Sequence, residues 1–263
     1  MLAHSRPVPS WYRSFYEKYV ADPDLLDAKP QGTDGPPASD EIYHILVTSS
    51  HLGAKDPNQQ VERLRIVGTY DSVPLARAAG HRALFDAGYE GEFFKAYGVT
   101  PAFFEAQKIP AQNQSGLLVH AVAQDETVFQ VRLLTTANDA KWTHQFEDGR
   151  ICKGLYYVVK TTTNYNDGSE GEAKRIYSIE GVFEKYVEAR KLALDALLVE
   201  ADGITRESFA QYEEVAGDER DCGYGENVLV HATGQDGENY SIAVVQGQVL
   251  ESVRLMEASM RIR

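Results

Sequence analysis

The chain has 263 residues, of which 43% are hydrophobic and 25% charged, a composition typical of globular proteins. Its net charge of −13 opposes binding to the phosphate backbone of nucleic acids. It has no run of 18 apolar residues, no apolar stretch at the N-terminus and only two cysteines. We therefore expect no membrane-spanning helix, no secretory signal and no disulfide framework, and a cytoplasmic location with the nucleus as the alternative.

The first segment, residues 1–40, predicts an aromatic helix followed by a flexible tether. Residues 10–20 (SWYRSFYEKYV) place aromatic side chains on one broad helical face, and the segment that follows them is rich in Pro, Gly and Asp. The helix either docks on the protein's own core or anchors a protein partner by lying in a groove. In the second interpretation, the contacts come from Trp11, Phe15, Tyr16 and Tyr19.

The first predicted folding unit begins with two strands and a helix. Ile42–Ser50 and Glu62–Tyr70 are rich in β-branched and aromatic residues, with a polar, turn-forming loop between them. The next segment predicts a helix, because Asp71 or Ser72 can cap it and Pro74 suits its first turn. Alanine and leucine then follow at helical spacing, which predicts one buried stripe.

A short helix and a hairpin complete this unit. Thr100 is a good N-cap for the short helix, and the alternating residues of Leu117–Ala123 and Thr127–Leu134 predict a β-hairpin. We assign the unit to residues 41–137 and expect residues 138–153 to be a linker.

The same order of elements recurs in residues 154–263, which end in a predicted closing helix. LVHAVAQDE from Leu118 matches LVHATGQDG from Leu229 at six of nine positions. Gly-x-aromatic triplets begin at Gly68 and Gly181, at the same offset that relates Tyr43 to Tyr156. These matches predict an α+β protein that contains one β-β-α-(α)-β-β unit twice, with mainly antiparallel sheets and a pseudo-two-fold axis.

This pattern resembles strand-strand-helix modules found in uncharacterised, mostly fungal proteins. The resemblance consists of a tyrosine-led strand with a threonine, a Gly-x-Tyr/Phe triplet and an alanine-rich helix. The residues that carry it are Tyr43, Thr48, Gly68, Tyr70, Ala76 and Ala83, with Tyr156, Thr161, Gly181, Phe183, Ala189 and Ala196. The resemblance implies a fold and no activity.

Two histidines are the first candidates for chemistry. His120 and His231 occupy the same position in the repeated phrase, and histidine can act as an acid, a base or a metal ligand. In the alternative interpretation, each histidine is a structural residue at the edge of the core, with a backbone carbonyl as its partner. No carboxylate stands at a fixed ligand spacing on the same strand, so we predict no metal site.

Two further pairs of residues recur at equal positions in the two units. Arg77 and Arg190 either hold an anionic ligand or lie along a helix edge beside acidic neighbours. Tyr43 and Tyr156 either line a ligand pocket or simply suit the start of a strand.

The remaining motifs point away from catalysis. Nucleotide-binding loops, the G-x-S-x-G elbow and the H-E-x-x-H zinc motif are absent from the sequence, so we expect no cofactor. Acidic neighbours are expected to raise the pKa of the Cys222 thiol and to make it a poor nucleophile.

The leading hypothesis is an intracellular, non-enzymatic binding or scaffold protein, with its binding surface at a sheet edge or at the seam between the two units. A second hypothesis is a small-molecule enzyme with its site at that seam. There His120 or His231 would be the general base, and Arg77 or Arg190 would hold an anionic substrate. A third is an acidic partner of a basic protein.

Overall fold

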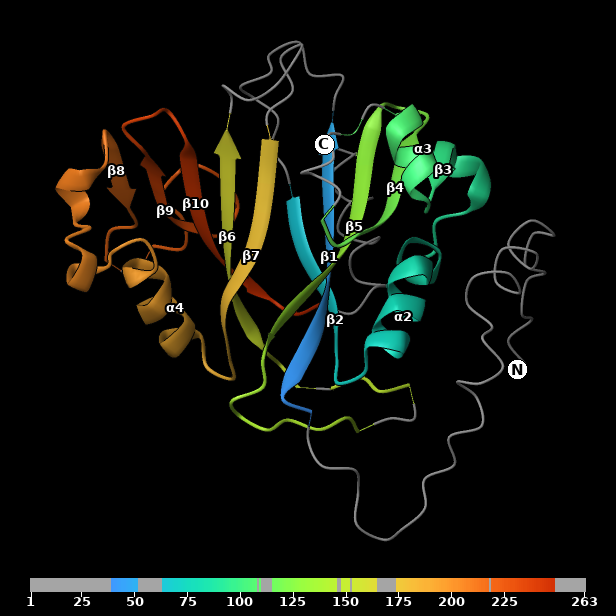
Figure 1. Cartoon of the computed structure of the whole chain (residues 1–263), viewed down its shortest axis with the longest axis horizontal. Coiled ribbons are helices and arrows are strands. Elements are labelled where there is room, and N and C mark those ends of the chain that lie inside the picture. Colours follow the sequence, from blue (N-terminus) through green and yellow to red (C-terminus); the bar gives the residue numbers. More distant parts are fainter. Residues whose placement is uncertain are drawn as a thin grey trace, which may run out of the picture. The chain divides into compact units, whose positions relative to one another are not determined.

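In the computed structural model, the described residues are 39–51, 63–107, 109, 115–145, 148–151, 153–164, 174–217 and 219–248. The predicted aromatic helix, with Trp11, Phe15, Tyr16 and Tyr19, and the predicted closing helix after residue 249 lie outside these ranges. Both stay predictions. The described ranges form two five-stranded antiparallel sheets with few helices, which confirms the α+β class (Figure 1).

Sheet A comes from the first half of the described chain. Its strands are ordered β2-β1-β5-β4-β3, and every neighbouring pair is antiparallel. The strands are β1 (Glu41–His51), β2 (Arg63–Tyr70), β3 (Phe94–Gly98), β4 (Leu117–Ala123) and β5 (Thr127–Ala137). The helices are α2 (Val73–Asp86), the 3-10 helix η3 (Gly91–Phe93) and α3 (Pro101–Ala106).

Sheet B comes from the second half and has the corresponding order, β7-β6-β10-β9-β8, again antiparallel throughout. The strands are β6 (Tyr156–Asn164), β7 (Lys174–Phe183), β8 (Gln211–Glu214), β9 (Val228–Thr233) and β10 (Asn239–Gln246). The helices are α4 (Tyr186–Asp195) and the 3-10 helices η5 (Glu200–Asp202) and η6 (Arg206–Ser208).

The N-cap residues predicted from the sequence stand at the helix starts, but not all of them make the expected side-chain hydrogen bond. Thr100 is the N-cap of α3, and its side chain accepts a hydrogen bond from the Phe103 N–H at 3.3 Å. Ser72 stands at the N-cap of α2, but its side chain makes no capping hydrogen bond. Thr205 caps a single 3-10 turn, where Ser208 completes a capping box.

The edge strands β3 and β8 correct the predicted unit, which had four strands instead of five. Their sequences, FKAYG and QYEE, are short and lack a clean alternation of apolar and polar residues, so periodicity did not reveal them. The two edge strands also differ in their position in the element order: β3 precedes α3, whereas β8 follows η6.

Three apolar layers separate four layers of secondary structure. Helix α2 covers one face of sheet A through small residues such as Ala76, Ala79 and Ala83, which let it lie close to the strands. Helix α4 covers one face of sheet B in the same way through Ala189 and Ala193. The other faces of the two sheets, which we call the inner faces, pack on each other (Figure 1).

The Gly-x-aromatic triplets explain a shared distortion of both sheets. Opposite Ile45/Leu46 and opposite Val158/Val159, the partner strand carries one extra residue, a β-bulge next to Gly68 and Gly181. A Cβ on Gly68 would lie 2.7 Å from a ring carbon of Tyr70. The glycine is required because the aromatic ring two residues later lies across it.

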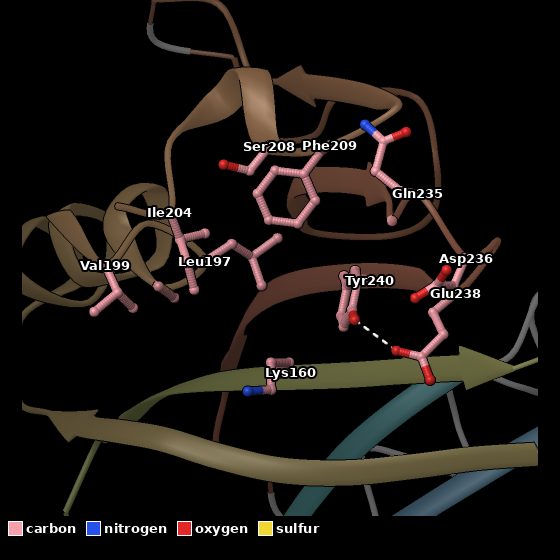
Figure 2. Close-up of a pocket in the computed structure, with 12 residues that line it drawn as sticks. Lys160, Leu197, Val199, Ile204, Ser208, Phe209, Gln235, Asp236, Glu238 and Tyr240 are labelled. Atoms are coloured by element: carbon pink, nitrogen blue, oxygen red, sulfur yellow. Dashed lines mark hydrogen bonds between the residues drawn. The ribbon is translucent and has the colours of Figure 1, made fainter. Parts of the chain in front are cut away.

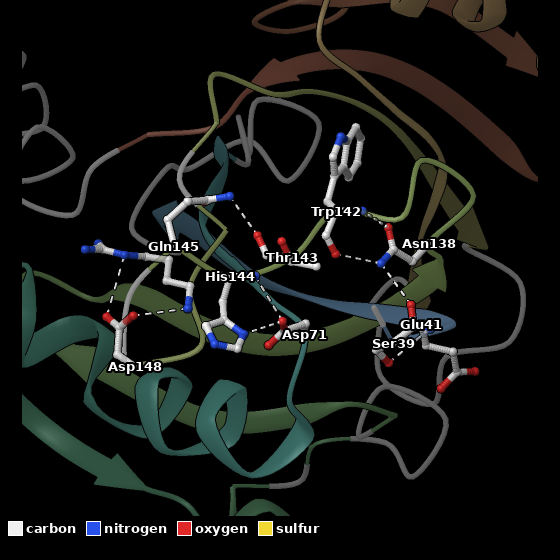
Figure 3. A network of polar contacts seen from close by, with 10 residues as sticks. Ser39, Glu41, Asp71, Asn138, Trp142, Thr143, His144, Gln145 and Asp148 are labelled. Carbon is white, nitrogen blue, oxygen red and sulfur yellow. Dashed lines mark hydrogen bonds and ion pairs between the residues drawn. The ribbon is translucent and has the colours of Figure 1, made fainter. Parts of the chain in front are cut away.

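The predicted linker is packed rather than free over its described residues. Trp142 is buried in the apolar layer between the sheets, and its Nε1–H donates to Glu184 Oε1 at 3.1 Å. The Asn138 side chain donates to the carbonyls of Trp142 and Ser39, both at 2.9 Å, and accepts from the Trp142 N–H at 2.9 Å (Figure 3). This connection therefore contributes to the core between the sheets.

Candidate functional site

A pocket of about 460 Å³ lies on the helix-covered face of sheet B (Figure 2). It is bounded by β6 and β10, by the residues that follow α4, by η6 and by the β9–β10 turn. The lining residues are Lys160, Ala196, Leu197, Val199, Ile204, Ser208, Phe209, Gly234, Gln235, Asp236, Glu238 and Tyr240. The apolar residues that lie between the inner faces of the sheets are not among them, so this pocket is not at the seam.

One end of the pocket is apolar. Leu197, Val199 and Ile204 gather there in Figure 2, with the Phe209 ring above them. Two backbone hydrogen bonds between Val199 and Ile204, at 3.1 and 3.0 Å, hold this loop, and Gly203 closes it with a φ of 71°. The ring of Phe209 meets that of Tyr240 edge to face, with centroids 6.0 Å apart.

The other end of the pocket carries two carboxylates. Glu238 Oε2 accepts a hydrogen bond from the Tyr240 hydroxyl at 2.6 Å, and Glu238 Oε1 accepts one from Asn164 Nδ2 at 3.2 Å. Both oxygens of Glu238 are thus held in place. Asp236 lies beside it at the tip of the β9–β10 turn (Figure 2). The hydrogen bond to Glu238, together with burial, raises the pKa of Tyr240 to about 12.

Lys160 adds one cation to the middle of the pocket. Its Nζ lies 3.4 Å from Glu180 Oε1 of β7, so a neighbouring carboxylate balances much of its charge. The lining contains no histidine or cysteine, and Tyr240 is protonated at neutral pH. The site therefore offers a shaped apolar surface and fixed acceptors, which are the elements of recognition.

None of the pocket residues was a site candidate from the sequence, although a signal was present. Gly181 follows Gly68 in the sequence by as many residues as Tyr156 follows Tyr43. Thr205, the second N-cap, follows Thr100 by fewer residues. The second half is thus shorter between its main helix and its next N-cap. A deletion beside a helix that covers a sheet can leave a space, and the pocket lies there.

His120 lies on the inner face of sheet A. Its neighbours Val119 and Ala121 belong to the core under α2, and side chains alternate along a strand, so His120 points the other way. Burial, and then the charge of Arg132, lower its pKa to about 4. Its Nδ1 is buried and has no hydrogen-bond partner among the described residues, and the Phe103 ring lies 6.5 Å away.

His231 has the corresponding position in sheet B but different neighbours. Its ring stacks on that of Tyr224, with centroids 4.0 Å apart and planes 2° from parallel. Burial lowers its pKa, and the charge of Glu213 partly opposes that shift. The two histidines stand in different sheets, each in contact with residues of its own half.

The two arginines lie on the outer helices, on the side of each sheet opposite to the histidine. Arg77 is exposed on α2. Arg190 of α4 donates to the carbonyl of Gly217. The enzyme hypothesis requires an arginine beside His120 or His231. The structure places neither Arg77 nor Arg190 there.

The two tyrosines pack against the apolar core under the main helix of each half. Tyr43 lies against the core of α2 and sheet A, and its hydroxyl donates to Glu41 at 3.1 Å. Tyr156 lies against the core of α4 and sheet B and meets Tyr186 edge to face at 5.7 Å. Neither tyrosine lines the pocket.

A buried polar chain crosses the layer between the sheets. His44, which has no exposed surface, contacts Thr69 Oγ1 through Nδ1 at 3.0 Å and Thr136 Oγ1 through Nε2 at 2.8 Å. Thr69 Oγ1 lies 2.6 Å from the Tyr157 hydroxyl of sheet B. Burial lowers the pKa of His44 to about 3, so this histidine is neutral in the folded protein at physiological pH.

A second polar cluster joins the start of α2 to the connection between the sheets (Figure 3). Asp71 Oδ2 accepts from the His144 N–H at 3.0 Å and lies 2.6 Å from His144 Nδ1. The Asp71 N–H donates to the Gly149 carbonyl at 3.3 Å. The Asp-His pair resembles two of the three members of a catalytic triad, but each of these contacts holds the connection, which gives the pair a structural role.

Three further features bear on other kinds of site. In the part of the chain that the structure describes, no three His, Cys, Asp or Glu residues are grouped to hold a metal ion. No described helix is both long and apolar enough to cross a membrane. The pKa of Cys222 is raised, as expected, but burial is the main cause and the acidic neighbours Asp221 and Glu213 add less.

No family model, curated protein or solved structure matches this chain. The resemblance to strand-strand-helix modules therefore stays a prediction.

Proposed function

We propose that this chain is a non-enzymatic binding protein, made of two fused copies of one α+β unit, that holds a small ligand in the pocket of sheet B. The observation that carries the proposal is the pocket of about 460 Å³, with an apolar end and an acidic end. Small-molecule sites commonly enclose roughly 300–1,000 Å³, lined by apolar groups with a few placed polar ones.

The contacts between the sheets support the duplication. His44 and Tyr157 stand at the offset of the repeat, as Gly68 and Gly181 do, and their rings meet edge to face at 5.3 Å. Equivalent residues touch each other where a two-fold axis passes between them. The strands pair in the same reciprocal way, since β5 packs on β7 and β2 on β10. We infer that a pseudo-two-fold axis runs between His44 and Tyr157.

Binding without catalysis is favoured over the enzyme hypothesis by the placement of the candidate residues. A base at His120 or His231 would need an anion-holding arginine nearby, and Arg77 and Arg190 lie on the other side of each sheet. In the pocket itself, the Glu238 carboxylate and the Tyr240 hydroxyl are tied in hydrogen bonds. These groups are fixed acceptors for a ligand.

The test is ligand-observed NMR with a set of small aromatic and aliphatic fragments. In Val199→Trp, the larger side chain should occupy the apolar end of the pocket and weaken fragment binding at least tenfold. Val199 is partly exposed, so the protein should still fold. Val187→Trp, on the exposed side of α4, is the matched control and should bind as the unchanged protein does. The proposal fails if no fragment binds, or if Val199→Trp binds as well as Val187→Trp.

A further inference from the structure

The first half of the chain contains an equivalent location with different surroundings. Phe129 pairs with Ser49 in sheet A as Tyr240 pairs with Thr162 in sheet B, and Ser49 and Thr162 stand at the offset of the repeat. Phe129 and Tyr240 therefore occupy equivalent places on the helix-covered faces of the two sheets. What surrounds Phe129 shows what the location can accommodate.

Aromatic rings fill the space next to Phe129. The ring centroids of Tyr89, Phe94 and Phe93 lie 5.2, 5.9 and 6.2 Å from that of Phe129. Phe93 and Phe94 belong to η3 and β3, the segment between α2 and α3. The segment between α4 and η6 in the second half is shorter and has no aromatic residue, so it places no such rings against Tyr240.

The polar end of the pocket differs in charge between the halves. The residue equivalent to Glu238 is Thr127, which is buried and whose N–H donates to Asp125. Both hairpin turns carry an aspartate, Asp125 or Asp236, and the second half adds the carboxylate of Glu238 beside it. With Lys160 balanced by Glu180, the charge that faces the pocket is negative.

We propose that the pocket binds a small molecule with an aromatic ring and a protonated amine. The ring lies over Tyr240, as Phe93 and Phe94 lie over Phe129, and the amine contacts Glu238 and Asp236. Edge-to-face contact favours an aromatic over an aliphatic ring, and a fixed carboxylate favours a cation over an anion. This inference depends on the proposed function and adds the class of ligand.

The experiment measures the affinity of the full chain for three probes: phenethylamine, 3-phenylpropionate and 2-cyclohexylethylamine. Phenethylamine is expected to bind at least tenfold more tightly than either of the others. Glu238→Gln should weaken phenethylamine binding about tenfold and leave 3-phenylpropionate unaffected or tighter. Glu219→Gln, an exposed carboxylate outside the pocket, is the control and should change neither affinity.

The outcomes separate the inference from the proposed function. Equal or tighter binding of 3-phenylpropionate, or of the cyclohexyl amine, would overturn the ligand class while the pocket still binds a ligand. The same holds if Glu238→Gln and Glu219→Gln behave alike. If neither these probes nor any fragment binds, the proposed function fails as well.

Discussion

Single residues in this protein show how burial sets the charge state. His44 is completely enclosed, and both ring nitrogens contact threonine hydroxyls instead of a charged group. Burial is the dominant cause of its pKa of about 3, because an imidazolium ion loses its hydration there. A neutral histidine is therefore part of the folded state.

This gives a prediction for pH dependence. The pKa of His44 in the folded state lies below the unfolded value of 6.5, so the unfolded chain takes up the proton first and stability falls as pH drops from 6.5 toward 3. Between pH 7 and pH 5 the loss should be about 2 kcal/mol. Urea unfolding at the two pH values measures it, and His44→Gln should reduce the difference by that amount. An equal difference in the variant would contradict this assignment.

Single elements depend on close approach between a strand and what covers it. In β7 the bulge places Gly181 under two side chains: a Cβ there would lie 2.6 Å from Leu192 Cδ2 and 2.8 Å from Phe183 Cε2. The close packing of β7, helix α4 and the Phe183 ring therefore requires a residue without a side chain at position 181.

We expect Gly181→Ala to lower the free energy of unfolding by about 1–3 kcal/mol, because the added methyl group displaces packed side chains. Gly154→Ala is the matched control, since a Cβ there meets nothing within 4 Å, and it should leave stability within about 0.5 kcal/mol. Chemical denaturation of both variants measures the two effects. Similar losses in both would show that the close approach does not matter.

The whole described molecule is joined by the apolar layer between its sheets. Residues of β1 and β2 meet residues of β6 and β7 there, and Trp142 of the connection is buried among them. Arg65 of sheet A, with a side chain only 5% exposed, also pairs with Glu226 of the second half at 2.9 Å. Two sheets held in this way should unfold as one unit.

Hydrogen exchange tests this cooperativity. Leu229→Ala removes a buried side chain from the core of sheet B and α4, at an expected cost of about 2–5 kcal/mol. The most protected amides of β1, in the other sheet, should lose the same free energy as those of β10, because they open only in global unfolding. Leu84→Ala, in the core of sheet A and α2, is the reciprocal variant. If only the amides of the mutated half lose protection, the two halves unfold separately.

Local patterns in the sequence are enough to establish the α+β class, the main strands, the main helices and the hairpins, and they mark the two Gly-x-aromatic triplets. These depend on interactions between residues close in the chain, such as alternation, capping and a ring that covers a glycine two positions away. The sequence also carried the length difference that accompanies the pocket.

Which side chains meet depends on the tertiary structure. It placed His120 and His231 apart from Arg77 and Arg190, joined His44 to Tyr157 across the seam, and brought Glu238, Tyr240, Lys160 and the loop after α4 around one space. Those encounters depend on the faces that the sheets present and on the length of the segments that cover them. Local pattern fixes which elements form, but a cavity exists where distant segments leave a volume unfilled.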